Sequence, residues 1–240
     1  MSNVLDLLVF GPHPDDVELG VGGTVALHAQ EGYQVGICDL TRGELGTNGT
    51  PEIRAREAKK AAEILGASVR ENLSLPDGFI RVNDQNLKKA IQLIRYFRPK
   101  VILAIDSLDD HPDHVHTSQL ITEAAHLSGL YNYPVQGERH RPDNIYYYIA
   151  ARPREPEMVV DISPVHDKKI EAILAHKSQL GLVDSPDTPS KSTRLTHPSF
   201  IERIKSRDRY VGSLANCEFG EGFIPYRTPR VTDFFSLGGE

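Results

Sequence analysis

Short apolar runs alternate with longer amphipathic stretches along the first 130 residues. The runs have the length and composition of buried strands and cover residues 4–10, 35–40, 69–73 and 101–105. The stretches between them have apolar positions at helical spacing and cover residues 17–30, 51–65, 87–97 and 113–128. This order of strand and helix predicts a mostly parallel sheet with helices on both faces. We therefore expect an α/β fold with a Rossmann-like core over residues 1–130.

The second half of the chain is less regular. Residues 145–149 and 158–162 have the pattern of strands, and residues 198–214 that of a final helix. Ser163 and Pro164 predict the cap and first position of a helix that reaches residue 179. Residues 181–198 are rich in Ser, Thr, Asp and Pro, which predicts a loop that either covers a site as a lid or lies on the surface. No linker divides the sequence, so we expect one domain over residues 1–240, in which 131–240 form a C-terminal elaboration of the core.

Composition and charge narrow the class of protein. The 240 residues are 39% hydrophobic and 25% charged, as in ordinary globular proteins, and the net charge of −6 predicts neither a nucleic-acid partner nor an anionic membrane partner. The sequence has no apolar run of the roughly 20 residues that span a bilayer, and its start lacks the pattern of a secretory signal. Cys38 and Cys217 lie too far apart in the sequence to form a metal-binding cysteine motif. We expect a cytoplasmic protein without disulfides.

Two short segments concentrate imidazole and carboxylate groups. His13-Pro14-Asp15-Asp16-Val17-Glu18 follows the first predicted strand, and residues 109–116, Asp-Asp-His-Pro-Asp-His-Val-His, follow the fourth. In a doubly wound sheet of order 3-2-1-4, strands one and four are neighbours at the switch point where such sheets bind ligands. We therefore expect the two segments to face each other across one crevice.

Imidazole and carboxylate ligands without thiolates favour Zn²⁺ or Fe²⁺ over Ca²⁺ or Mg²⁺. A site with three protein ligands and a water is typical of catalysis, and a neighbouring carboxylate and histidine can serve as general base and general acid. This combination indicates hydrolysis of an amide. Either segment alone has a structural alternative, in which Asp15 or Asp113 caps the next helix.

At these residues the sequence resembles the PIG-L/LmbE-like family of metal-dependent N-acetylglucosamine deacetylases. The first segment and His111-Pro112-Asp113-His114 together are specific to that family. Within the family the chain is most similar to the deacetylases of bacillithiol biosynthesis, which act on N-acetylglucosaminyl malate. Further similarity lies in residues 36–44, around Arg54 and Glu57, in residues 72–78, and at Ser178-Gln179.

The resemblance implies a role for nine residues of this sequence. The implied zinc ligands, with water completing the site, are His13, Asp16 and His114. Asp15 would be the general base, and His111, oriented by Asp113, would stabilise the oxyanion and protonate the departing amine. Residues implied to touch the sugar or form the pocket wall are Arg54, Glu44 and Asn48.

One departure from the family pattern affects the expected substrate. Relatives usually carry arginine directly before the second motif, where this chain has Asp110, and an anion there weakens attraction for a carboxylate such as malate. His116 adds a similarity to relatives that act on an inositol glycoside. The expected substrate is N-acetylglucosaminyl malate, and the alternatives are an inositol glycoside or a chitooligosaccharide.

The same residues are also compatible with two other classes of protein. Two histidines and a carboxylate also form the metal-binding face of non-haem Fe(II) oxygenases, and a metal-stabilised sugar-binding protein needs no catalysis. The glycines of residues 20–23 lie within a predicted helix, so they favour close packing against the sheet over dinucleotide binding. The family resemblance also implies a homo-oligomer, often a hexamer.

Overall fold

The computed structural model describes residues 4–150, 152, 154–183 and 190–233 and contains one central sheet. Its strands lie in the order β3-β2-β1-β4-β5-β7-β6. Their bounds are β1 (Leu7–Gly11), β2 (Val35–Thr41), β3 (Val69–Leu75), β4 (Val101–Ile105), β5 (Asn144–Tyr148), β6 (Met158–Asp161) and β7 (Gly220–Pro225). Strands β1 to β5 pair in parallel, and β7 runs antiparallel to both β5 and β6.

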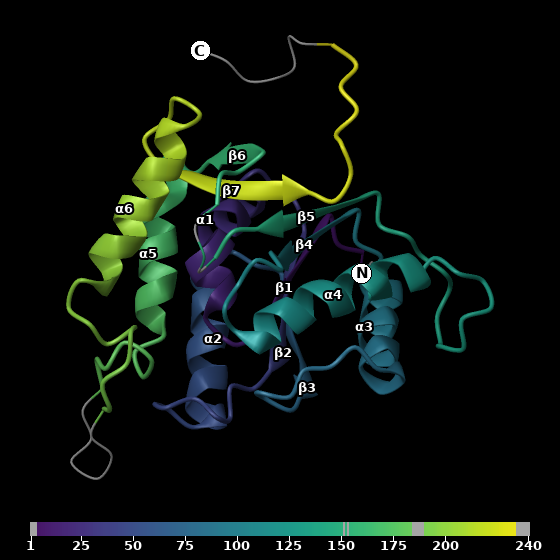
Figure 1. Cartoon of the computed structure of the whole chain (residues 1–240), viewed down its shortest axis with the longest axis horizontal. Coiled ribbons are helices and arrows are strands. Elements are labelled where there is room, and N and C mark those ends of the chain that lie inside the picture. Colours follow the sequence, from purple (N-terminus) through teal and green to yellow (C-terminus); the bar gives the residue numbers. More distant parts are fainter. Residues whose placement is uncertain (1–3, 151, 153, 184–189, 234–240) are drawn as a thin grey trace.

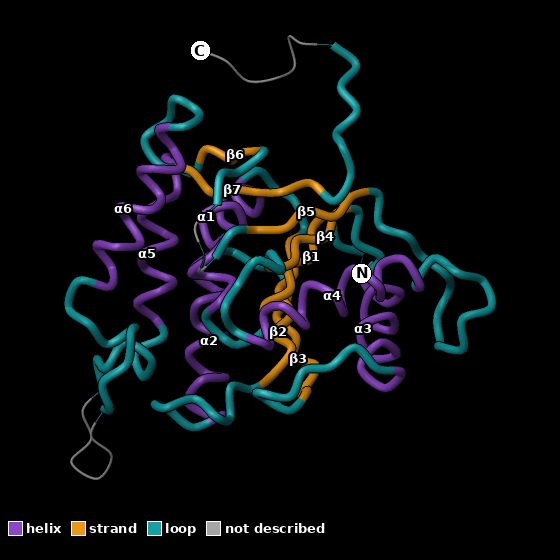
Figure 2. The backbone as a smooth tube through the Cα atoms, viewed as in Figure 1, coloured by secondary structure: helices purple, strands orange, loops and turns teal. Residues whose placement is uncertain are grey.

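Helices cover both faces of this sheet. Their bounds are α1 (Asp16–Gln30), α2 (Pro51–Leu65), α3 (Asp84–Phe97), α4 (Pro112–Leu127), α5 (His166–Ala175) and α6 (Phe200–Ser213). Figures 1 and 2 show α3 and α4 on one side of the strands and α1, α2, α5 and α6 on the other. Two buried apolar clusters fill the two interfaces, one with residues of α1, α2 and α5 and one with residues of α3 and α4. The predicted α/β class and strand order are confirmed.

Local sequence explains most element boundaries. Helix α2 begins at Pro51 after Thr50, whose hydroxyl accepts a hydrogen bond from the Ile53 N–H at 3.3 Å, and ends at Gly66 in the left-handed conformation. In α1, a Cβ on Gly20 would lie 2.6 Å from the ring of Tyr148 on β5. Only glycine allows the helix to approach the sheet this closely, as the sequence predicted for the 20–23 segment.

In the second half, one strand was not predicted and one predicted helix is wrong. Residues 220–225 form β7, which the sequence analysis missed because two of its six residues are glycine and the last is proline. Ser163 does not cap a long helix: Ser163–Val165 is a 3₁₀ turn that follows Ile162, and α5 ends at Ala175 instead of residue 179. Six residues of the predicted 181–198 loop, 184–189, lie outside the described residues.

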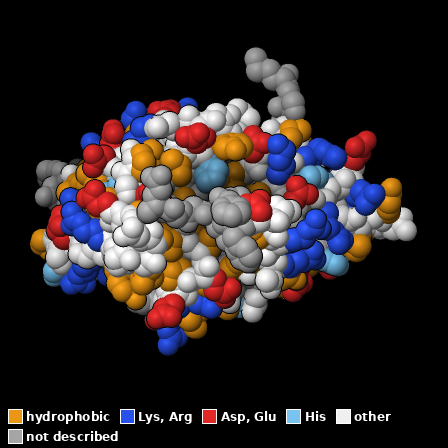
Figure 3. Space-filling model, turned by 90° about the horizontal axis from the view of Figure 1, so that it is seen from above, with side chains coloured by type: hydrophobic (Ala, Val, Ile, Leu, Met, Phe, Trp, Pro, Cys, Tyr) orange, Lys and Arg blue, Asp and Glu red, His pale blue; other side chains and the backbone are white. Residues whose placement is uncertain are grey.

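The surface of the molecule mixes charges of both signs. On the face shown in Figure 3, acidic and basic side chains stand among one another with patches of hydrophobic side chains between them. Among the described residues, no helix has both the length and the apolar character needed to cross a membrane.

Candidate active site

The two histidine-rich segments meet because their strands are neighbours. Strands β1 and β4 pair in parallel, with Leu7 opposite Val101 and Val9 opposite Leu103. The first segment leaves β1 after Gly11 and the second follows β4 after Ile105, so both lie at the carboxyl edge of the sheet. The chain reverses its order of strands between β1 and β4, which is where ligands bind in open α/β sheets.

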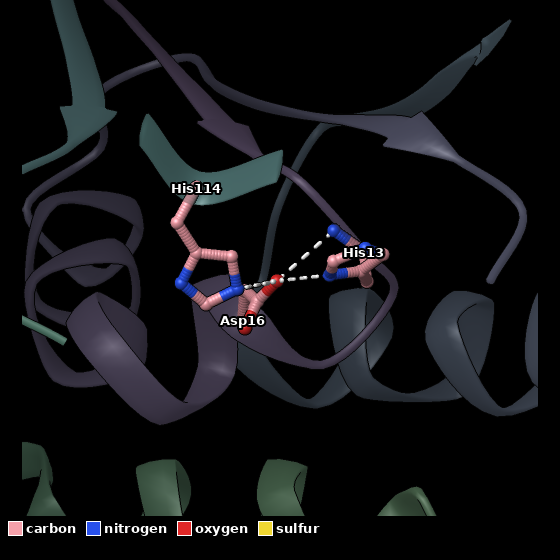
Figure 4. Close-up of side chains that lie close together, drawn as sticks. All are labelled: His13, Asp16 and His114. Atoms are coloured by element: carbon pink, nitrogen blue, oxygen red, sulfur yellow. Dashed lines mark hydrogen bonds and ion pairs between the residues drawn. The ribbon is translucent and has the colours of Figure 1, made fainter. Parts of the chain in front are cut away.

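Three buried donor groups converge at this edge. The Asp16 Oδ2 atom lies 3.0 Å from His13 Nδ1 and 3.5 Å from His114 Nε2, and Figure 4 shows the carboxylate between the two imidazoles. Atoms bound to one tetrahedral zinc at about 2.0–2.2 Å are roughly 3.3–3.6 Å apart. The three side chains therefore need little movement to share one divalent cation, and two nitrogens with one carboxylate oxygen form a donor set that suits Zn²⁺ or Fe²⁺.

Carboxylates also hold the outer nitrogen of each imidazole. His13 Nε2 lies 3.0 Å from Asp77 Oδ1, and His114 Nδ1 lies 2.9 Å from Asp109 Oδ2. A carboxylate behind a ligating histidine fixes the orientation and tautomer of its ring. Burial lowers the pKa of His114, but Asp16 and Asp109 outweigh burial and raise it to about 9.

The sequence analysis gave no role to Asp77 or Asp109. Asp77 follows the end of β3 by two residues, and Asp109 precedes the second motif. The available signal was the position of both acids just beyond parallel strands that end at the same edge of the sheet.

Asp15 lies at the start of α1 in an unusual backbone conformation. Its φ angle is 132°, and its side chain makes no capping hydrogen bond, so the alternative of a simple helix cap does not describe it. Such a conformation costs about 1–3 kcal/mol in a residue with a side chain and is common at functional sites. Burial raises the pKa of Asp15 to about 6, although the Arg54 guanidinium, 3.4 Å from its Oδ2, opposes the shift.

His111 is held differently from the expectation. The predicted contact was an orienting interaction from the Asp113 carboxylate, but that carboxylate accepts hydrogen bonds from the Gly78 and Ile80 N–H groups at 2.7 and 3.2 Å. It is the backbone N–H of Asp113 that donates to His111 Nδ1, at 3.2 Å. Burial and the nearby His13 lower the pKa of His111. A neutral His111 that accepts at Nδ1 has its proton on Nε2.

One of the three expected pocket residues lines the cavity, and the other two do not. Arg54 lines the cavity, but its Nη1 and Nη2 atoms donate to the Gly43 and Pro14 carbonyls at 3.1 and 2.7 Å. Glu44 and Asn48 are not among the lining residues. Glu44 accepts a hydrogen bond from the Asp77 N–H, and Asn48 pairs with the backbone of residue 191, so both stabilise loops behind the wall.

The donor cluster opens into a cavity of about 620 Å³. Its wall also includes Pro112, at the start of α4, and the loop residues Leu45, Gly46, Thr47, Asp110, Gln179, Thr193, Arg194 and Leu195. Leu45, Gly46 and Thr47 come from the loop after β2, and Thr193, Arg194 and Leu195 precede α6, so the cavity combines parts of the core and of the C-terminal elaboration.

Comparison with known proteins agrees with this arrangement. Residues 8–125, which include both motifs, match the family model described as PIG-L, GlcNAc-PI de-N-acetylase. The chain is 38% identical to the solved structure of the conserved protein TT1542 from Thermus thermophilus, with a TM-score of 0.86 over 95% of this chain and 97% of that one.

Three relatives with different activities are similar to this chain. Diacetylchitobiose deacetylase of Thermococcus kodakarensis is 29% identical and covers 93% of this chain and 85% of its own. The 4-oxalmesaconate hydratase of Pseudomonas putida is 30% identical, with coverages of 94% and 90%. A probable N-acetyl-α-D-glucosaminyl L-malate deacetylase of Bacillus cereus is 28% identical, with coverages of 72% and 83%. The expected similarity to malate deacetylases therefore has weaker support than the family itself.

Proposed function

Because this chain belongs to the PIG-L/LmbE family, we propose that it is a metal-dependent hydrolase that removes the acetyl group from an N-acetylglucosamine conjugate. The observation that carries the proposal is the convergence of His13, Asp16 and His114 at the mouth of a large cavity, with Asp15 and His111 beside them. An open site of two imidazoles and one carboxylate is typical of catalytic zinc.

The proposed cofactor is Zn²⁺, with Fe²⁺ as the ion that the same donors also accept. His13, Asp16 and His114 would hold it, and Asp77 and Asp109 would keep the two imidazoles oriented. When bound, the ion lowers the pKa of a water molecule and polarises the acetamide carbonyl.

We assign the proton transfers to Asp15 and His111. The Asp15 carboxylate accepts a proton from the attacking water, whose oxygen forms a bond to the acetamide carbon. Asp15 lines the cavity beside the donor cluster, where its carboxylate can reach such a water. The His111 Nε2–H first donates a hydrogen bond to the oxyanion. The proton that Asp15 accepted then passes to the amide nitrogen as the C–N bond breaks, which gives a free amine and acetic acid, and the acid ionises to acetate.

Arg54 has a different proposed role from the one that the resemblance implies. Two of its guanidinium nitrogens donate to the backbone carbonyls of Gly43 and Pro14, and its side chain is 4% exposed. We propose that Arg54 positions the loop that carries Asp15, and that the sugar contacts the other lining residues.

The aglycone was expected to be malate, and the comparisons support a chitooligosaccharide better. The chitobiose deacetylase covers 93% of this chain and the malate deacetylase 72% at similar identity. We therefore keep the malyl conjugate as one of several N-acetylglucosaminides to be tested.

A second candidate function is hydration of an unsaturated dicarboxylate. It is favoured by the 30% identity to the hydratase over 94% of this chain. Activation of water is common to both reactions, so the same donors would serve either one.

The test is release of acetate by the zinc-loaded protein. Diacetylchitobiose and the malyl and inositol N-acetylglucosaminides are offered separately, and we expect acetate from at least one. If none releases acetate while 4-oxalmesaconate is hydrated, the hydratase assignment replaces the deacetylase assignment.

A further inference from the structure

A second cavity adjoins the proposed active site. It has a volume of about 360 Å³ and shares four lining residues with the first cavity: Asp16, Leu19, His114 and Arg194. Two of these are donors of the metal cluster. A substrate whose acetamide lies at the cluster can therefore extend a neighbouring group into this second hollow.

One face of α6 forms the far wall of the second cavity. Phe200, Arg203, Ile204 and Arg207 line it, and their spacing of three, four and seven residues places them on one side of the helix. The apolar members can contact a carbon skeleton. The two arginines bring positive charge toward the donor cluster.

Arg207 is already occupied by protein groups. Its Nη1 donates to the Ala150 carbonyl at 3.1 Å, its Nη2 donates to the Leu19 carbonyl, and its Nε contacts the buried Asp208 carboxylate at 3.1 Å. These contacts join α6 to α1 and to the chain after β5. Arg207 therefore has a structural explanation and is not available for a ligand.

Arg194 and Arg203 differ from Arg207 in this respect. Both are exposed, both line the second cavity, and within the described part of the chain neither guanidinium has a hydrogen bond or an ion pair. Asp16 is the one carboxylate among the lining residues of this cavity, and it belongs to the donor cluster. Two arginines thus face a hollow with no protein anion assigned to them.

Charge is distributed unequally around the proposed site. Asp110 lies on the wall of the first cavity, whereas the second cavity is lined by three arginines in a chain whose net charge is −6. An anionic group is repelled near Asp110 and attracted near Arg194 and Arg203. Guanidinium groups bind carboxylate and phosphate oxygens through paired hydrogen bonds.

We propose that the second cavity is a specificity subsite for an anionic group, a carboxylate or a phosphate, on the substrate. Arg194 and Arg203 bind the anion, and Leu19, Phe200 and Ile204 contact the carbon atoms that join it to the sugar. The proposal rests on the proposed deacetylase function, but it does not depend on the substrate of any one relative. It names acidic N-acetylglucosamine conjugates as the substrate class, in place of the neutral chitooligosaccharide that the similarity to diacetylchitobiose deacetylase favours.

The test compares acidic and neutral substrates of the same sugar. The acidic ones are malyl N-acetylglucosaminide and N-acetylglucosamine 1-phosphate, and the neutral ones are methyl N-acetylglucosaminide and diacetylchitobiose. The measured quantity is the ratio of kcat/KM for acetate release between acidic and neutral substrates. We expect the wild-type ratio to exceed one, and the more active acidic substrate identifies the anion.

The double variant R194Q/R203Q tests the residues. We expect its acidic-to-neutral ratio to fall by about tenfold or more, mainly through KM, because charge-assisted hydrogen bonds to the anion are lost. The matched control is R56Q, which removes an exposed arginine that lines neither cavity. A wild-type preference for neutral substrates, or an unchanged ratio in the double variant, overturns the proposal.

A binding measurement separates this proposal from the proposed function. Calorimetry compares L-malate with its uncharged diamide on wild type and on the double variant, without any turnover. Tighter binding of malate that the double variant loses supports the subsite even if no N-acetylglucosaminide is deacetylated. Equal binding of malate by the two proteins contradicts the subsite even if deacetylation is found.

Discussion

Helix α1 connects two clusters of buried charged side chains, of which one borders a cavity and the other is enclosed by protein. At its first turn, Asp16 lies between His13 and His114, and the group opens into a cavity of about 620 Å³. Farther along, backbone angles depart from helical values at Val21, and the N–H groups of Gly23 and Thr24 donate to Glu221 of β7 at 2.9 and 2.7 Å.

The second cluster is closed. Lys169 of α5 lies 2.7 Å from Glu221 Oε1 and 2.8 Å from Asp208 Oδ2, and the three side chains are 0–2% exposed. Each of these charges has an opposite charge within the protein, and none of the three side chains lines either cavity beside the donor cluster. The comparison teaches that buried charge alone does not indicate catalysis. A better indication of catalysis is a cluster of metal-ligating side chains that borders a cavity, as His13, Asp16 and His114 do.

The largest expected effect is at the open cluster. In D15N, the base is replaced by an amide of the same shape, so we expect kcat for acetate release to fall by about 10²-fold or more while metal content is unchanged. Acetate release and metal analysis on the same sample measure the two quantities. The control is D167N, an exposed aspartate on α5. Wild-type turnover in D15N would remove Asp15 from the proposed mechanism.

At the closed cluster we expect a loss of stability without a loss of chemistry. K169M removes the cation that lies between the buried carboxylates of Asp208 and Glu221. Asp208 keeps its contact with Arg207, but the loss of Lys169 is expected to lower the free energy of unfolding by about 3–5 kcal/mol. Urea denaturation measures this change, and kcat of the folded protein should remain at its wild-type value. K168M, at an exposed neighbouring lysine, is the matched control. A large fall in kcat for K169M, with the fold intact, would show that the two clusters are not separate.

The carboxylates behind the donor histidines should have an intermediate effect. D109N weakens the partner of His114 Nδ1, so we expect metal affinity to fall by about 10–100-fold. Competition with a chelator of known affinity gives the dissociation constants. The adjacent D110N is the control for metal affinity, since the Asp110 side chain is 89% exposed and its ion-pair partner is Arg152. Equal affinities in both variants would contradict an orienting role for Asp109.

The smallest expected effect is a pH dependence of stability from the closed cluster. Burial raises the pKa of Asp208, but Lys169 and His166 outweigh burial and hold it below the ordinary value of 3.8. A carboxyl group whose pKa is lowered by folding contributes stability above its unfolded pKa, and that stability is lost as the pH falls below about 4. Urea titrations between pH 7 and pH 3 should show a smaller decline in D208N than in wild type. Parallel declines would assign the acid sensitivity to other carboxylates.

Most of the core was predictable from the sequence because its elements are locally encoded. The apolar run 101–105 forms β4 with the same bounds, and α2 begins and ends at the Pro51 and Gly66 signals. The strand order followed from the alternation of strands and helices, which restricts parallel sheets to few topologies. Strand β7 was missed because its pairing partners, β5 and β6, lie far away in the chain and its own residues have low strand propensity.

The candidate site was predictable in its chemistry and only partly in its contacts. Both motifs follow neighbouring strands, and the structure brings His13, Asp16 and His114 together, while their roles as ligands remain a proposal. His111 is oriented by the backbone N–H of Asp113 and not by its carboxylate as expected. The carboxylate instead accepts hydrogen bonds from backbone N–H groups of the loop after β3. Glu44 and Asn48 lie behind the wall for a similar reason: loop conformation decided their partners.

By itself, the sequence determined the fold class and the chemical identity of the donor groups, since periodicity and residue type are local properties. The tertiary structure alone decided which charged side chains form buried ion pairs and which line a cavity. Lys169 contacts Glu221 from 52 positions away, and Arg194 and Arg203, both beyond residue 190, line a cavity that Asp16 and His114 also line. Such contacts depend on how helices pack against the sheet, and no pattern within a single segment encodes that packing.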